Sequence, residues 1–398
     1  MTLKLHKVTA QIERLRKNAL ARAEAIRAAL PGARQALDAA SRRDDLFERS
    51  RKAAARGWDG AMLTGREPLT LQKSAPPPEP LTLVAVDGSQ VYPDTHAASL
   101  FYALNIGYFI LRGRTGGTDA DSEPTIVFEE DSLYVNGALI SRVILNARRT
   151  VEEMVVLQRL AAREQADGAP PIVALADGGL ALRIDEKSFP PAERKALQER
   201  FFMAVDRLAE DGIPPAGYIA RPGGSPVLSL LALALDPDPE PSVERLRASK
   251  QFRGLTDSML YEQILGSGER SPVFEFASFW NTYYSDRAQR TSTPSHSVHF
   301  FYLNVGVRYP VIARVEIPQW AAEQPALVDR VHATLVEQSA VTLNDPYPYA
   351  LIRADEEAFV SGEEKAYLEE QMAVALIRDG LRVNRSEKLA HKGRARRH

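Results

Sequence analysis

The sequence predicts a mixed α/β fold in which helices flank one sheet, and two patterns lead to this prediction. Strand-like segments come first as a meander over 81–128, and further strands then alternate with helical segments from 140 onward. A meander followed by strand–helix alternation favours a mixed sheet over a barrel or a sandwich. A charged helical segment precedes the first strand. We therefore expect a helical arm ahead of the α/β domain.

The predicted arm begins with a helical pattern over 4–56. Apolar residues recur there at three- and four-residue steps, the spacing of one helix face: Leu5, Val8, Ile12, Leu15 and Ala19. Leu30-Pro31-Gly32 interrupts the pattern and predicts two helices. The pattern fits either a helical hairpin or an amphipathic pair lying on the main domain. The proline-rich segment 76–80 is an extended spacer, so we place the arm at 1–75.

Three predicted strands open the α/β domain. The first covers 81–86, the second covers 96–111 and ends before glycines that predict a turn, and the third lies around 125–128. A helix over 140–165 and a buried strand over 172–176 follow.

The later elements alternate between helix and strand. We predict helices over 190–212, 326–339, 349–360 and 363–378, and strands over 218–220, 297–305 and 311–317. Between them, residues 236–290 are aromatic and have no clear period, which predicts an inserted irregular subdomain. The prediction is one α/β domain over 81–380 and a basic tail over 381–398.

Composition excludes several classes of protein. The chain has no cysteine, which rules out disulfides, zinc–thiolate sites and thiol nucleophiles, and favours a cytoplasmic location. It has no apolar run of roughly 18 residues, so no membrane partner is expected. The formal net charge is −2, although the tail is strongly basic and includes Lys388 and Lys392. Such a tail either binds phosphates or is simply a solvated end.

Carboxylates follow two of the predicted strands. Asp87 ends the first strand and Asp177 ends the strand at 172–176, each with a glycine after it. Ligands bind at the carboxyl ends of strands in open α/β sheets, and two carboxylates that converge there suit Mg²⁺ or Mn²⁺. The alternative is that each Asp-Gly only turns the chain.

A third acidic position lies on the helix between these strands. Glu152 and Glu153 flank the apolar stripe of the helix, so either side chain could reach a metal over the sheet. The alternative is a solvated pair one helical turn apart, such as Arg149 with Glu153.

The sequence resembles the NurA family over most of its length from Leu83 onward. The resemblance rests on seven segments in this order: VDGSQ (86–90), RTVEEM (149–154), LADGGL (175–180), GYIARP (217–222), HSVHFFYL (296–303), ARVEIP (313–318) and YPYALIRAD (347–355). The seven segments in this order indicate the NurA family more specifically than any one of them does alone.

The resemblance implies an RNase H-like fold, a five-stranded mixed sheet with an acidic cluster. The implied acids are Asp87 on strand 1, Glu153 on a helix with Glu152 as the near alternative, Asp177 on strand 4, and Asp355 on a C-terminal helix. The family motif usually ends in Ala-His where this chain has Ala354-Asp355, so the fourth ligand departs from the pattern. His296 is a further candidate ligand or proton carrier.

The implied activity is a metal-dependent nuclease that cuts DNA from 5′ to 3′, with endonuclease activity on single strands as a further expectation, in DNA-end resection and double-strand break repair. Three or four carboxylates can hold two divalent ions, Mn²⁺ or Mg²⁺. Arg149, Arg221, Lys388 and Lys392 are candidates for binding the DNA backbone. The resemblance further implies a homodimer that works with the HerA hexameric ATPase.

Two other classes of function remain open from the residues alone. A DNA- or protein-binding scaffold on the same fold would keep the acids only as turn residues, and metal binding separates it from a nuclease. A sugar- or acetate-kinase-like ATPase would need glycine-rich phosphate loops, which this sequence lacks.

Overall fold

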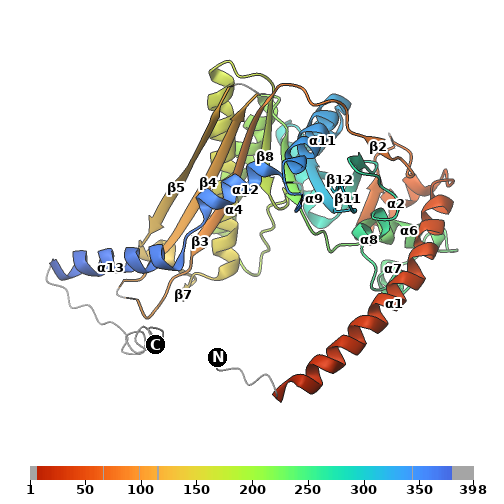
Figure 1. The fold of residues 1–398 in the computed structure, drawn as a ribbon, viewed down its shortest axis with the longest axis horizontal. Helices are drawn as coiled ribbons and strands as arrows, with labels where there is room; N and C mark the ends of the chain where they lie inside the picture. Colours follow the sequence, from red (N-terminus) through yellow and green to blue (C-terminus); the bar gives the residue numbers. More distant parts are fainter. Residues whose placement is uncertain (1–6, 66, 98, 114–115, 343, 379–398) are drawn as a thin grey trace. The chain divides into compact units, whose positions relative to one another are not determined.

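The chain folds into two compact units, each built from two separate stretches of sequence. The computed structural model describes residues 7–65, 67–97, 99–113, 116–342 and 344–378 (Figure 1). Unit 1 comprises Met1–Pro78 and Gly217–Tyr347, and unit 2 comprises Glu79–Ala216 and Pro348–His398. These boundaries differ from the predicted arm and single domain, because the chain leaves unit 2 at residue 216 and returns to it at residue 348.

Unit 2 is built on a mixed sheet. Its strands are β3 (Thr82–Val91), β4 (Tyr102–Arg112), β5 (Thr118–Val127) and β8 (Ile172–Asp177), in the order β8-β3-β4-β5. β3 runs parallel to β8 and antiparallel to β4, and β4 is antiparallel to β5. Figure 1 shows β3, β4 and β5 side by side. The predicted mixed α/β sheet is therefore confirmed. β5 begins at Thr118, several residues before the apolar segment that predicted a strand around 125–128.

Helices cover both faces of this sheet. α4 (Arg142–Ala166) and α12 (Tyr349–Ala358) pack directly on its strands, and α5 (Pro191–Glu210) packs on α4. Unit 2 also contains α13 (Gly362–Arg378) and the short elements α3 (Glu130–Leu133), β6 (Tyr134–Val135) and β7 (Ala138–Leu139). α4 packs against Gly88 of β3, and α12 packs against Gly107 of β4. Gly107 pairs with Asp87, the neighbour of Gly88. Paired residues face the same side of a sheet, whereas consecutive residues of a strand face opposite sides. Gly107 and Gly88 therefore face opposite sides, and so do the helices α12 and α4 that pack on them.

Unit 1 contains an antiparallel sheet and more helices. The strands are β1 (Gly60–Leu63), β2 (Lys73–Ser74), β10 (Glu269–Arg270), β11 (Phe274–Ala277), β12 (Val298–Asn304) and β13 (Ile312–Pro318), with the last residues of β9 (Pro215–Ile219) paired to β13. The helices are α1 (Thr9–Ala40), α2 (Leu46–Ala55), α6 (Pro226–Leu235), α7 (Val243–Ala248), α8 (Asp257–Tyr261), α9 (Phe279–Thr291), α10 (Gln319–Ala322) and α11 (Pro325–Ala340).

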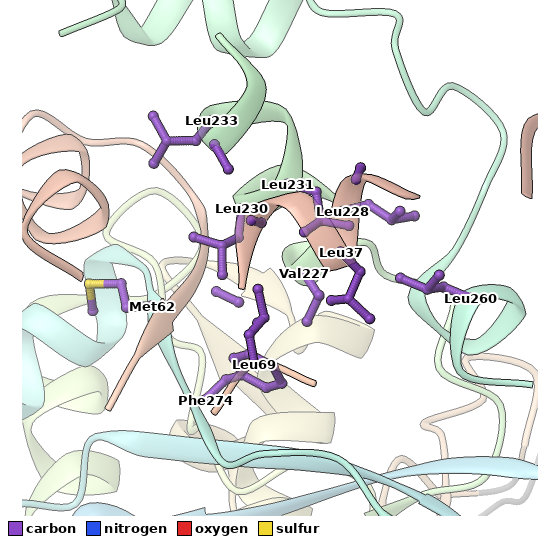
Figure 2. Packing of buried hydrophobic residues seen from close by; sticks show 14 of the residues in the cluster. Leu37, Met62, Leu69, Val227, Leu228, Leu230, Leu231, Leu233, Leu260 and Phe274 are labelled. Carbon is purple, nitrogen blue, oxygen red and sulfur yellow. The ribbon is translucent and has the colours of Figure 1, made fainter. Parts of the chain in front are cut away.

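The core of unit 1 joins residues that are far apart in the sequence. Leu37, Met62 and Leu69 pack with six apolar residues of α6 and with Phe274, most of which Figure 2 labels. The C-terminal part of the predicted arm is thus part of a folded unit, whereas residues 9–25 of α1 are exposed.

The predicted helix break at Pro31 is wrong. α1 continues through Pro31 to Ala40. Proline in a helix interior removes one backbone hydrogen bond and introduces a clash. Ala33, Leu37 and Ala40 are buried in the next turns, and their packing offsets that cost. The first break comes at 41–45, before α2.

The predicted irregular insert, 236–290, contains more regular structure than expected. It forms two short helices, β10, β11 and most of α9. β11 pairs with β1 and β12, and the Phe276 ring stacks on Phe300 at 4.1 Å. A four-residue strand is too short to show a period, and its partner β1 lies about 200 residues upstream. Among the described residues, no helix is both long and apolar enough to cross a membrane.

Candidate metal centre

Four acidic side chains of unit 2 come together at one edge of the β3–β8 pair. Val86 pairs with Ala176 in the parallel register, so Asp87 and Asp177 are the next residues on two neighbouring strands. Asp87 is partly buried and accepts a hydrogen bond from its neighbour Gly88 N at 2.7 Å. Asp177 is exposed, and its turn continues through Gly178 at φ +92°, a backbone conformation that favours glycine.

Glu153 reaches this edge from α4. A Cβ on Gly88 would lie only 2.4 Å from Glu153 Oε1 and 2.9 Å from Arg149 Cγ. A side chain at position 88 would therefore displace the carboxylate of Glu153 and the side chain of Arg149. Glu153 is buried, with 8% of its surface exposed, and its Oε1 pairs with Arg149 Nε at 3.1 Å. Arg149 Nη1 also donates to Gly88 O at 3.1 Å.

Asp355 reaches the same edge from α12. A Cβ on Gly107 would meet Ala354 O and Ala358 N at 2.3 Å, so α12 depends on a glycine for its close approach. The last turn of α12 is fixed to the sheet, because Ser89 Oγ donates to Ala358 O at 2.5 Å and Asn105 Nδ2 donates to it at 2.9 Å. Asp355 is exposed and hydrogen-bonds the side chain of Asp87.

The cluster holds its protons more tightly than isolated acids do. Burial raises the pKa of Asp87 to about 7; the Gly88 N–H opposes this, and Asp177, Glu153 and Asp355 add to it. Burial likewise raises the pKa of Glu153 to about 7, which Arg149 opposes and Asp177 reinforces. Like charges gathered in a partly dry site favour the protonated form. A cation among them would favour the ionised form.

The donor set fits a divalent ion. All four side chains offer carboxylate oxygens, the ligands that Mg²⁺ and Mn²⁺ prefer, and mutual repulsion among them would be relieved by positive charge. Over the described ranges, no three histidine, aspartate or glutamate side chains stand arranged to hold a metal ion as they are. The acids would therefore have to close around an ion by rotating their side chains.

The other predicted site residues lie elsewhere. Glu152 forms a two-point ion pair with Arg200 of α5, at 2.6 and 2.8 Å, and so faces a different partner from Glu153. His296 is buried in unit 1, just before β12, and Arg221 is exposed in unit 1 after β9. Lys388 and Lys392 lie outside the described residues.

Sequence reasoning missed the residues that bring α12 onto the sheet. These are Gly107 and Asn105 on β4 and Ser89 on β3. A signal was present, because Gly107 and Asn105 interrupt an otherwise apolar and aromatic strand. Glycine inside a strand often marks close approach of another backbone.

The chain was compared with known families and structures. The model of the NurA domain matches residues 81–360, whereas no curated protein matches. The NurA nuclease of Sulfolobus solfataricus has 14% sequence identity and a TM-score of 0.49, with 77% of this chain and 88% of that chain covered. A second NurA structure has 13% identity and a TM-score of 0.46, covering 92% and 98% of the two chains. A NurA structure with manganese has 12% identity and a TM-score of 0.45, covering 95% and 99%.

Proposed function

The chain belongs to the NurA family, and from this premise we propose that it is a divalent-metal-dependent deoxyribonuclease. One observation carries the proposal: Asp87, Glu153, Asp177 and Asp355 lie at one edge of a sheet although they are distant in the sequence. Acids that served only the fold would have no reason to converge and to raise the pKa of Asp87.

Each acid has a distinct position in the proposed site. Asp87 is central, since its pKa responds to the other three, and we assign it to bridge two ions. Glu153 and Asp177 flank it and would hold one ion each, and Asp355 completes the set. Such ions activate a water molecule and stabilise the leaving 3′-oxygen of a phosphodiester. Asp355 stands where the family usually has histidine, and it keeps the donor set all-oxygen, which suits Mn²⁺ or Mg²⁺.

Cations of the chain would hold the substrate. We assign DNA-backbone binding to Arg149, Arg221, Lys388 and Lys392. The proposed substrate is linear DNA digested from 5′ to 3′, with cutting of single strands as a further activity, in the resection of DNA ends at double-strand breaks. Family membership supports this assignment.

We further propose that the protein acts as a homodimer with a HerA-type hexameric ATPase, again on the basis of family membership. Co-purification of the two proteins from one organism, followed by resection assays with ATP, tests the partnership. Degradation of duplex ends is expected to need both proteins. Full activity without the ATPase would contradict the proposal.

The activity itself is tested with linear DNA labelled at the 5′ or the 3′ end, in the presence of Mn²⁺ or EDTA. Asp87→Asn should lower the Mn²⁺-dependent rate by more than about 100-fold, since even the loss of a residue that only supports a metal ligand costs 10- to 100-fold. Asp211→Asn makes the same change at an exposed residue after α5 and should keep the wild-type rate. Retained activity in Asp87→Asn would rule out the assignment.

A further inference from the structure

Of the two predicted DNA-binding residues that the structure describes, Arg149 lies inside the acid cluster and Arg221 lies in unit 1. The side chain of Arg149 is 30% exposed and that of its partner Glu153 only 11%, so the pair is less solvated than an ordinary surface pair one helical turn apart. Arg149 is also fixed at a second point, because Nη1 donates to Gly88 O. Ion pairs on the surface contribute little to stability, because water screens the charges and both side chains lose conformational freedom. Here burial reduces the screening by water, and the hydrogen bond to Gly88 O already restrains the Arg149 side chain.

The oxygen that Arg149 holds is the one nearest β3. Glu153 Oε1 lies against the Cα of Gly88, the residue after Asp87, and the same Oε1 is 3.1 Å from Arg149 Nε. A divalent ion shared by Asp87 and Glu153 would need this oxygen or its twin on the same carboxylate. A guanidinium and a divalent ion therefore compete for one buried carboxylate.

We propose that Arg149 is a built-in counter-ion of Glu153 that competes with the divalent ion, so that it sets the ion concentration at which the site fills. The inference rests on the proposed function and assigns Arg149 a role as a positioning residue. Neutralising Glu153 keeps a buried carboxylate in place beside the other acids, since a buried charge without a partner is costly. The same contact has to be given up, wholly or in part, when an ion binds, which weakens ion binding.

The test is the affinity for Mn²⁺ alone, measured by titration calorimetry on the full chain without DNA. Arg149→Gln should lower the Kd for Mn²⁺ by about tenfold, equivalent to about 1.4 kcal/mol. Arg149→Lys keeps the charge and should bind Mn²⁺ close to the wild-type affinity. Thermal unfolding without metal shows that each variant is folded.

A matched control lies on the neighbouring helix α5. Arg200 pairs with Glu152, the residue next to Glu153, in an exposed two-point ion pair. Arg200→Gln removes one positive charge from an Arg–Glu pair outside the acid cluster. Its Mn²⁺ affinity should equal that of the wild type, so a general effect of net charge is separated from competition for Glu153.

The decisive comparison is a double-mutant cycle with Glu153→Gln. Arg149→Gln should tighten Mn²⁺ binding in the wild-type background and have no effect when Glu153 is already neutral. An unchanged or weaker affinity in Arg149→Gln, or an equal effect in both backgrounds, would overturn the inference and leave the proposed function standing. A wild-type chain that binds no Mn²⁺ would overturn both.

Discussion

At the scale of single residues, the structure distinguishes two neighbouring glutamates that the sequence left as alternatives. Glu153 is buried beside Asp87 and Asp177, whereas Glu152 pairs with Arg200. Glu153→Gln is therefore expected to reduce Mn²⁺-dependent nuclease activity by more than about 100-fold, since even the loss of a residue that only supports a metal ligand costs 10- to 100-fold. Glu152→Gln should keep a rate close to that of the wild type, because the Glu152 carboxylate pairs with Arg200 outside the acid cluster. Rates on end-labelled DNA check this. Equal losses in the two variants would contradict it.

A second residue makes the stability of unit 1 depend on pH. His332 is fully buried and its Nε2 donates to Gly268 O at 2.9 Å. Burial lowers the pKa of His332 to about 4 from an ordinary 6.5. The unfolded chain therefore takes up a proton before the folded chain does, and stability is lost as pH falls from about 6.5 to about 4.

The expected loss from His332 over this window is about 3 kcal/mol, from 1.36 kcal/mol per pKa unit. Urea unfolding at pH 7 and at pH 4.5 measures it in the wild type and in His332→Gln. The variant keeps an N–H donor and cannot become charged, so its free energy of unfolding should fall less on acidification. Parallel pH profiles for the two proteins would refute this assignment.

At the scale of elements, Gly107 of β4 allows the backbone of α12 to approach the sheet closely. Gly107→Ala would place a Cβ 2.3 Å from backbone atoms of α12, which cannot move as a flexible side chain could. Overpacking of this kind costs about 1–3 kcal/mol, and it displaces the helix that carries Asp355. Urea unfolding and nuclease assays should both show a loss. Gly362→Ala, where a Cβ meets nothing within 4 Å, is the control and should leave both unchanged.

Two of the four acids could be predicted from local sequence patterns. β3 and β8 are short apolar runs that each end in Asp-Gly, so both strands and both aspartates follow from local pattern. The position of Asp355 does not, because it depends on Gly107 and on the hydrogen bonds from Ser89 and Asn105 to α12. Those are tertiary contacts across about 250 residues. For the same reason, periodicity alone could not reveal β11 or the continuity of α1 through Pro31.

At the scale of the whole molecule, the N-terminal segment is part of a core and also extends beyond it. Leu37, Leu46, Trp58, Met62 and Leu69 are buried in unit 1. At roughly 2 kcal/mol for each buried side chain, their removal would cost about as much as the total stability of a typical domain. A chain that lacks residues 1–75 should therefore show no cooperative unfolding of unit 1.

A shorter deletion provides the contrast. Residues 9–25 of α1 are exposed, and the first partly buried residue that packs on the core is Ile26. Removal of residues 1–25 should leave the main thermal transition of the purified protein in place, as observed by calorimetry. A loss of that transition in the short deletion would show that the exposed part of α1 stabilises the fold.

The discontinuous path of unit 2 has a consequence for the order in which the protein is made. The strands that carry Asp87 and Asp177, and the helix that carries Glu153, leave the ribosome before any part of 217–347, whereas α12 follows that whole stretch. A nascent chain can thus form the sheet while it still lacks its fourth acid. The proposed metal site is completed only when translation has passed residue 355, so a chain that stalls earlier lacks one of its four acids.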